Sequence, residues 1–521
     1  MDVFAQDQWK ILPNLTLNIG IRYELPSAIY ELDNRGVNLI PGQGMTLFGT
    51  NQVLNIDTTK VGPASLVLTP GATTLPNSGQ LKVDRNNVAP VLGFAWSPFK
   101  GSDATVLRGG FRVGYDDVFN NIPANLSLNA PFNLTTAQAS GTTQPGKFDY
   151  GTAFNQNVPL VKNVGKQGPG TPQVGLVAFN GMDPNIRESY NYAYNLGIEQ
   201  QLTSHMSFEA DYIGSLGRKL GIFVDPNQPT VTVVDPTKRG NQTPNIQTFP
   251  YPTYGSFSDA FGKAAVNSNY SGLVTIIKYR GFRNIAVQGS YTWSHSLDYS
   301  SAFFGSTGDV GYPSNGNNLK AEYGNSSFDM RHRFVGYYSI PLPIGPGQPF
   351  LNSSNILSRE ALEGWTVSGI TEIQSGTPFT AYLGGTDYSG FNQFADRPNI
   401  STGKLAQNNK NPDNAFSTSY FSTITAGQIG TERRDQYFGP GLVNFDLTAS
   451  KDFPLSRERF KLNFRADLFN IFNHTNFSNP VANFTSSSFG KITSTVGNAT
   501  SGTGGTIGGA RLAQFALRLN F

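Results

Sequence analysis

The sequence predicts an all-β protein, an antiparallel transmembrane β-barrel of the outer-membrane type, and three observations support that prediction. About thirteen segments of roughly ten residues alternate between apolar and polar side chains, which is the period of a β-strand. Short turns and long polar connections follow each other along the chain, as they do in outer-membrane barrels. The final segment, ARLAQFALRLNF, keeps this alternation up to its last residue, the aromatic Phe521.

The composition fits neither a disordered chain nor an ordinary soluble domain. Of the 521 residues, 38% are hydrophobic and only 14% are charged, while 57 are Gly, 38 are Phe and 22 are Tyr. Disordered segments combine few aromatic residues with high charge, so disorder is excluded. The net charge of +3 is too small to indicate nucleic acid as a partner. Because the chain has no Cys, disulfides and thiol-based metal or redox chemistry are excluded.

The predicted strands pair through short turns, and long connections separate one pair from the next. In order, they cover residues 3–9 and 15–24, 88–98 and 105–115, 190–200 and 207–215, 271–280 and 285–295, 329–343 and 362–376, 442–453 and 459–469, and finally 510–521. In the second strand Leu17, Ile19 and Ile21 share one face and Arg22 lies on the other, a pattern that the later strands repeat. The turns span roughly four to six residues, except in the fifth pair, and the long connections roughly thirty to seventy.

This alternation suits a membrane. A strand of about ten residues tilted by about 45° just spans the hydrocarbon layer. Backbone groups find no water there, so only helices or closed sheets can cross. Soluble sandwiches, propellers and solenoids also alternate, but the strand length, the asymmetric connections and the aromatic last residue favour the barrel. No run of apolar residues is long enough for a membrane-spanning helix, and the start MDVFAQDQWK shows no signal peptide.

Several segments resemble those of one receptor family. VFAQDQWKILPNLTLNIGIRYE, residues 3–24, resembles the strand, turn and strand of TonB-dependent outer-membrane receptors, and DLFNIFNHTNF, residues 467–477, resembles their penultimate strand. FDMRHRFVGYYSIPLPIG, GWTVSGITEIQSGTPFT, DRPNIS and YFGPGLVNFDLTASKDF are similar to the Oar-like subgroup. These segments are spread in order over nearly the whole chain.

The resemblance implies a barrel of 22 strands, an N-terminal plug in its lumen, and energy delivered through TonB. About thirteen strands and no plug-like segment are present, and thirteen is an odd number, whereas bacterial barrels have an even one. Residues 1–521 are therefore expected to be the C-terminal portion of such a barrel, with the plug and N-terminal domains absent from this chain. The resemblance also gives a barrel-insertion signal at the end of the chain, namely Phe515, Leu517, Leu519 and Phe521.

No catalytic residue, cofactor or metal site is predicted, so the protein is not expected to be an enzyme. The four histidines lie far apart and lack metal-ligand spacing; they are His205, His295, His332 and His474. No G-x-S-x-G, Walker A or G-x-G-x-x-G sequence is present. The loop pieces GTDYSG and STGDVG contain Asp, but they lack the carboxylate spacing of an EF-hand.

Two aromatic clusters in the long connections are candidate ligand-binding sites. They are Phe303, Phe304 and Tyr312 in one connection, and Tyr388, Phe391 and Phe394 in another. Rings flanked by amide side chains suit stacking on sugars or gripping a peptide, although they also suit packing of the connections against one another. Arg433 and Arg434 are expected at the barrel rim, either in salt bridges or facing lipopolysaccharide. The lumen-facing arginines would meet a plug or a solute in the full protein, and ion pairs with neighbouring Asp and Glu are favoured over a role in selectivity; they are Arg108, Arg112, Arg465 and Arg518.

The function that these patterns favour is active uptake across the outer membrane of a Gram-negative-type bacterium. Extracellular loops would capture the substrate, and force from TonB on the missing plug would open the lumen. A passive porin-like channel and a surface adhesion or secretion-linked barrel are the alternatives. The expected partners are outer-membrane lipid and lipopolysaccharide, the barrel-insertion machinery, TonB, and a substrate that is a siderophore, glycan, peptide or protein.

Overall fold

The computed structural model describes most of the chain, and every structural statement below concerns the described residues. These are residues 2–26, 33–57, 66–75, 84–99, 104–116, 125–129, 180–228, 250–251, 261–302, 313–345, 348–351, 362–384, 388–389, 396–425, 427–456, 460–496 and 509–520. No helix among them has the length and apolar character needed to cross a membrane.

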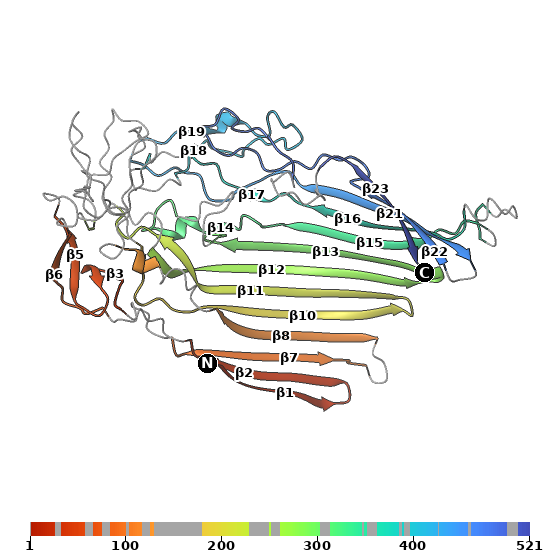
Figure 1. Ribbon diagram of the computed structural model, residues 1–521, viewed down its shortest axis with the longest axis horizontal. Helices are drawn as coiled ribbons and strands as arrows, with labels where there is room; N and C mark the ends of the chain where they lie inside the picture. The colour runs from red at the N-terminus through yellow and green to blue at the C-terminus, as the bar shows by residue number, and fades with distance from the viewer. Residues whose placement is uncertain are drawn as a thin grey trace.

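One large sheet contains all of the predicted strands (Figure 1). Its main path runs in chain order through β1 (Asp2–Leu12), β2 (Leu15–Glu24), β7 (Asn87–Trp96), β8 (Thr105–Asp116), β10 (Ser189–Thr203), β11 (Met206–Val224), β12 (Phe261–Gly281), β13 (Ile285–Asp298), β15 (His332–Pro341), β16 (Trp365–Gln374), β21 (Leu442–Ser456), β22 (Phe460–Phe469) and β23 (Leu512–Asn520). Each strand of the path is antiparallel to its neighbours. The short strands β9 (Gly181–Met182) and β14 (Gly324–Asn325) pair beside it and complete a 15-stranded sheet.

The register places the apolar residues of successive strands on one face. Ile19 of β2 lies opposite Leu92 of β7, which lies opposite Phe111 of β8. At the other end of the sheet Phe464 of β22 lies opposite Leu517 of β23. We call this the apolar face, and the other the polar face. Ile19 is 46% exposed and Leu517 69% exposed, so no second protein layer covers these side chains.

The two edges of the sheet are open. Within the described residues β1 pairs only with β2, and β23 only with β22. Every residue of both edge strands is exposed, whichever face of the sheet its side chain lies on. Figure 1 shows them at opposite margins of the curved sheet, β1 in red and β23 in dark blue. An open edge leaves a row of backbone N–H and C=O groups without sheet partners.

The long connections contain ordered structure, and this differs from the loops without structure that the sequence predicts. A separate four-stranded sheet consists of β3 (Val37–Ile40), β4 (Gly44–Leu47), β5 (Gln52–Ile56) and β6 (Leu66–Pro70). Two small pairs lie further along, β17 (Pro378–Phe379) with β20 (Tyr437–Phe438) and β18 (Asn399–Ile400) with β19 (Phe421–Ser422). The remaining elements are 3-10 turns, η2 (Leu126–Leu128), η4 (Phe282–Asn284), η5 (Leu319–Glu322) and η6 (Thr418–Tyr420). These strands are too short for an alternating pattern to be visible in the sequence.

The clusters of buried apolar side chains lie among these connections and where the connections meet the ends of strands of the large sheet. Leu39, Met45 and Leu54 of the four-stranded sheet pack against Ile222 of β11 and Phe261 of β12. This contact explains why β11 and β12 continue to 19 and 21 residues, well beyond the predicted length. The far ends of these extensions carry apolar side chains that a protein layer covers, so they need not alternate.

Candidate binding region in the long connections

Most of the predicted ligand-binding residues lie outside the described residues. Phe303, Phe304, Tyr312, Phe391 and Phe394 belong to this group, as does Phe521 of the insertion signal. Their roles stay predictions.

Tyr388 is described and is half-buried. Its carbonyl accepts a hydrogen bond from the backbone N–H of Gly427, at 2.9 Å. The next residue, Ser389, is buried and donates its N–H to Asp396 Oδ2 at 2.8 Å. These bonds hold the backbone of Tyr388 against neighbouring turns of the same connection, and the binding role of its ring stays a prediction.

An aromatic cluster joins the last two long connections. Phe379 stacks on Phe416 with ring centroids 5.7 Å apart, and Phe421 and Phe489 contact Phe416 edge-on. Phe416 is 1% exposed. Because Phe489 follows β22 while the other three follow β16, the cluster fixes one connection against the other. Aromatic pairs of this geometry contribute roughly 0.5–1.5 kcal/mol beyond their buried area.

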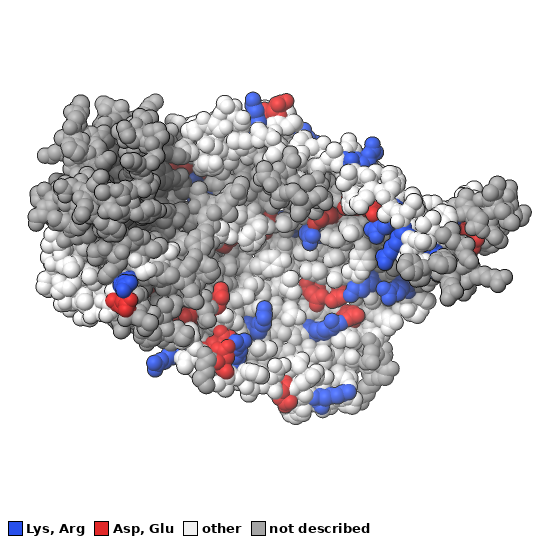
Figure 2. Space-filling view, viewed as in Figure 1, with Lys and Arg blue, Asp and Glu red and all other residues white. Residues whose placement is uncertain are grey.

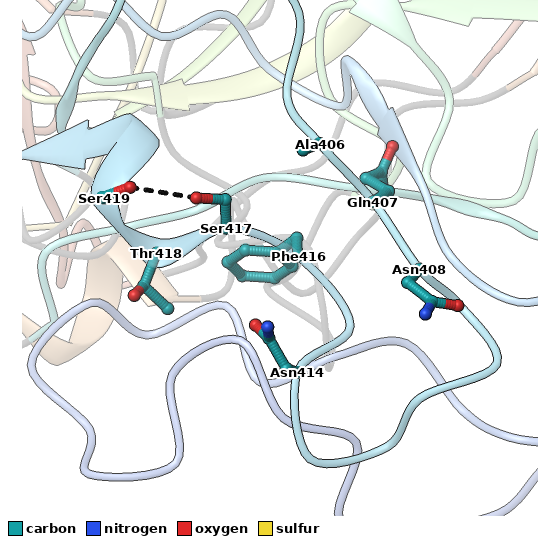
Figure 3. A pocket seen from close by; sticks show the side chains of 8 residues that line it. All are labelled: Ala406, Gln407, Asn408, Asn414, Phe416, Ser417, Thr418 and Ser419. Carbon is teal, nitrogen blue, oxygen red and sulfur yellow. Dashed lines mark hydrogen bonds between the residues drawn. The ribbon is translucent and has the colours of Figure 1, made fainter.

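A pocket of about 330 Å³ opens beside this cluster. Its lining residues are Ala406, Gln407, Asn408, Asn414, Phe416, Ser417, Thr418 and Ser419. Figure 3 shows their amide and hydroxyl groups arranged around the Phe416 ring, with a hydrogen bond of 3.0 Å between the Ser417 and Ser419 hydroxyls. All eight are neutral, so the pocket suits an uncharged ligand group that exchanges hydrogen bonds. Sequence reasoning missed this site, although the polar run from Gln407 to Asn414 marks it.

The backbone around the pocket is shaped by local hydrogen bonds. Asn408 Oδ1 accepts from the N–H of Lys410, and Asn411 Oδ1 accepts from the N–H of Asp413. Such Asx turns are a common use of Asn in loops. Farther away, Gln407 Nε2 donates to the carbonyl of Phe438 at 3.1 Å, which fastens the pocket wall to β20.

A buried ionic cluster joins the connection between β13 and β15 to the connection between β16 and β21. The Arg434 guanidinium pairs with Asp298 at the end of β13 and with Asp435, the latter at 2.8 Å. Its Nε also donates to the carbonyl of Glu322 at 3.0 Å, and the Glu322 carboxylate pairs with Arg397. Of the expected pair at the rim, Arg434 is therefore buried in salt bridges, while Arg433 is exposed.

Glu432 lies in the connection between β16 and β21, and only one of its two carboxylate oxygens has a hydrogen-bond partner among the described residues. Its Oε1 accepts the N–H of Ala381 at 2.8 Å, while no described group bonds to its buried Oε2. Burial raises the pKa of the Glu432 carboxyl to about 8, against the lowering effects of the Ala381 N–H and the Arg397 charge. The carboxyl is consequently mostly protonated at neutral pH.

Acidic and basic side chains pair across the polar face of the large sheet. Arg108 pairs with Glu199, and Arg465 pairs with Asp467 at 2.8 Å, as the sequence predicts. Further pairs join Lys278 to Glu209 and Arg333 to Glu372. No carboxylate among the described residues pairs with the other two predicted arginines. Figure 2 shows positive and negative groups lying next to one another over the strands.

The histidines do not come together. His205 contacts Ser204, His295 contacts Asn325, His332 contacts Tyr291, and His474 contacts Asn476. Among the described residues no group of three His, Cys, Asp or Glu side chains is placed to hold a metal ion.

A sheet with one apolar face, one charge-paired face and strands of about membrane-spanning length defines a β-barrel membrane protein. A family model described as an outer membrane beta barrel domain matches residues 1–514. The chain belongs to this family and is located in the outer membrane. The apolar face is accordingly the face that contacts lipid.

Three solved structures are similar to this chain. The outer membrane transporter YddB from Escherichia coli is 9% identical, with 99% of this chain and 44% of that chain covered and a TM-score of 0.43. The siderophore receptor PiuA from Acinetobacter baumannii is 8% identical, with 99% of this chain and 42% of that chain covered and a TM-score of 0.41. The FrpB iron transporter from Neisseria meningitidis is 9% identical, with 100% of this chain and 45% of that chain covered and a TM-score of 0.41. The chain thus spans less than half the length of these structures. A search of the curated proteins found no match.

Proposed function

We propose that this chain is the C-terminal part of the β-barrel of a TonB-dependent receptor of the Oar-like subgroup, which binds a substrate through its long connections and imports it. Membership of the outer-membrane barrel family supports the proposal, and so do the receptor-like segments at residues 3–24 and 467–477. In this proposal the remainder of the receptor supplies the other strands, a plug and the contact with TonB. No catalytic step is assigned to the chain.

The open edges of the sheet support the need for further strands. In the hydrocarbon layer an unsatisfied backbone group costs several kcal/mol, so a sheet with two free edges is unstable there. Residues 1–521 alone are expected to give no sealed pore in a planar bilayer. Recovery of a monodisperse, conducting barrel from these residues would contradict the proposal that they are only one part of a larger barrel.

The observation that carries the receptor function is the ordered layer formed by the long connections at one end of the sheet. Three apolar clusters, the buried Arg434 and a neutral pocket give this layer a defined shape, which supports the proposal that it binds a substrate. In the proposed function the pocket holds an uncharged, hydrogen-bonding part of the substrate. The aromatic side chains predicted to bind ligand, Tyr388 among them, would contribute further rings to the binding of the substrate.

Growth of a deletion strain tests this function. The strain is supplied with single iron, carbon and nitrogen sources, and loss of growth on one source identifies the substrate class. Uptake of that source by the wild type is then measured with the proton-motive force intact and dissipated. Active import requires the proton-motive force, whereas continued uptake without that force indicates a passive channel. If the deletion strain loses cell attachment but keeps normal uptake, the protein is an adhesion protein.

Two substitutions distinguish a loss of binding in the pocket from a general disturbance of the connection that contains it. Asn414→Trp places a large side chain in the pocket, and Thr402→Trp places the same side chain at an exposed position of the same connection outside it. The pocket variant is expected to raise the substrate concentration needed for half-maximal uptake, and the control is not. Equal effects of both variants would remove the pocket from the proposal.

A further inference from the structure

The lipid-contacting face carries two basic side chains, Arg218 and Lys219, where the regular pairing of β11 with β12 is interrupted. The register between β11 and β12 shifts between Gly217 and Leu220, and Lys219 has a positive φ of 52° at this irregularity. Arg218 lies opposite Tyr190 of β10, which belongs to the apolar face. The Lys219 Nζ lies 5.7 Å from the centre of the same Tyr190 ring. Both positive groups are therefore on the side of the sheet that meets lipid.

Their height matches the outer boundary of the membrane. From Met206, next to the short turn, to Arg218 the strand rises by about 40 Å, or about 28 Å across the membrane at a tilt near 45°. The apolar band of such barrels is about 25 Å tall. Arg218 and Lys219 thus lie just beyond the hydrocarbon, on the side of the long connections.

Aromatic rings mark the same boundary. Tyr190 contacts Tyr115 at 5.7 Å and Tyr192 at 5.3 Å, and Tyr192 stacks on Phe111 at 6.0 Å. Tyr side chains gather at the level of the lipid headgroups, where the ring lies in an apolar layer and the hydroxyl meets water. The two basic residues stand immediately beside this cluster.

Among the described residues, the charges of Arg218 and Lys219 have no acidic partner. Arg218 Nη1 donates to three neutral acceptors, the carbonyls of Gly217 and Ser268 and Asn269 Oδ1, at 2.8, 3.1 and 3.2 Å. Within the described part of the chain nothing accepts from its Nε or Nη2, and no carboxylate pairs with Arg218 or Lys219. On the polar face, by contrast, Arg108 and Lys278 each have a carboxylate partner.

We propose that Arg218 and Lys219 bind a phosphate group of a phosphorylated lipid of the outer leaflet, with the Tyr190 cluster packing against the sugar and upper acyl chain. The Nη1 bonds hold the guanidinium in place, so its remaining N–H groups can donate to two phosphate oxygens. Lys219 adds a second charge from the adjacent residue. This inference depends on the location in the outer membrane and is independent of the proposed import function.

Lipid retained during purification tests the proposal. The full-length protein that contains residues 1–521 is expressed in a bacterial outer membrane whose lipid A carries two phosphates. It is extracted in a mild detergent, and its bound lipid is counted by native mass spectrometry. The variant R218Q/K219Q is compared with R112Q/R280Q, which removes the same charge from exposed arginines on the polar face. The wild type and the control are expected to keep the phosphorylated lipid. The site variant is expected to lose it by about tenfold or more, as the loss of a charge-assisted pair implies.

Other outcomes of the same measurement also test whether Arg218 and Lys219 bind a lipid phosphate. The charge-conserving variant R218K/K219R is expected to retain the lipid, and this remains measurable if the glutamine variant does not fold. Equal retention by R218Q/K219Q, or equal retention of lipid A that lacks phosphates, would overturn the proposal. Displacement of the lipid by inorganic phosphate alone would show that the site takes the free ion, and this too would overturn it.

Discussion

Arg434 and Asp298 form a buried ion pair although 136 residues separate them in the sequence. Asp298 is the last residue of β13, and Arg434 precedes β20 in the connection that follows β16. Asp435, beside the arginine, accepts a second bond from it. One guanidinium thus neutralises two buried carboxylates and joins the ordered connections to the end of a membrane strand.

Arg434→Gln is expected to loosen this junction. It leaves Asp298 and Asp435 buried without their positive partner, which costs roughly 3–5 kcal/mol. Arg433→Gln is the matched control, because Arg433 is the adjacent residue and is exposed, where a substitution changes stability by less than about 0.5 kcal/mol. Amide hydrogen exchange in residues 296–302 and 432–438 measures the effect. Similar exchange rates in both variants would show that the pair does not hold the junction.

Glu432 is expected to make this layer less stable as the pH rises. Its pKa is about 8 in the folded protein and 4.5 without burial. Between these values the folded protein binds a proton that the unfolded chain releases, so stability falls from about pH 4.5 to about pH 8 and is constant on either side. The shift corresponds to at most roughly 5 kcal/mol.

Glu432→Gln tests that pH dependence. The amide keeps the shape, can still accept the Ala381 N–H, and carries no titrating proton. Protease resistance of the connection between β16 and β21 is expected to decline with rising pH in the wild type and to stay level in the variant. A decline of the same size in both proteins would assign the pH effect to another group.

The strands were predictable because lipid and lumen impose opposite demands on neighbouring residues. Any strand that crosses the bilayer must alternate, so Leu273 and Val274 of β12 point to different faces, and Leu273 lies opposite Trp293 on the apolar face. The extensions 216–224 and 261–270 were missed because regular alternation ends near the register shift between Gly217 and Leu220, and because the connections cover their far ends, Ile222 and Phe261 among them.

The candidate site was predictable only in kind. The polar, aromatic composition of the long connections predicts that they bind a ligand, and this stays a prediction; Tyr388 lies in one of these connections. The contacts that shape the layer join residues far apart in the sequence, such as Arg434 with Asp298 and Phe416 with Phe489. No local pattern encodes such pairs, because each depends on how separate connections fold together.

The assignment of the two faces predicts opposite results for neighbouring positions in β12. Leu273→Arg places a charge on the lipid-contacting face, where it costs roughly 2–4 kcal/mol near the membrane centre. Val274→Arg places the same side chain on the polar face, opposite Asp211 of β11. Only the first variant is expected to reduce the folded, heat-modifiable form in outer membranes. Comparable losses from both substitutions would contradict the assignment of the faces.

The insertion signal that the sequence predicts at the C-terminus can be tested in β23. Phe515, Leu517 and Leu519 are 68%, 69% and 51% exposed on the apolar face, and Gln514 lies on the polar face opposite Asp467. Phe515→Ser removes about 2–3 kcal/mol of apolar burial in lipid and changes the row that the insertion machinery is predicted to recognise. It is expected to leave most of the protein unassembled, and deletion of Phe521 to do the same.

Gln514→Ser is the control for that experiment, because it changes the neighbouring residue on the polar face of the same edge strand. The assembled fraction is measured as the heat-modifiable band in outer-membrane preparations. If Gln514→Ser reduces that fraction as much as Phe515→Ser, the machinery recognises the strand backbone and not its apolar row. A normal fraction for Phe515→Ser and for the Phe521 deletion would remove these residues from the signal.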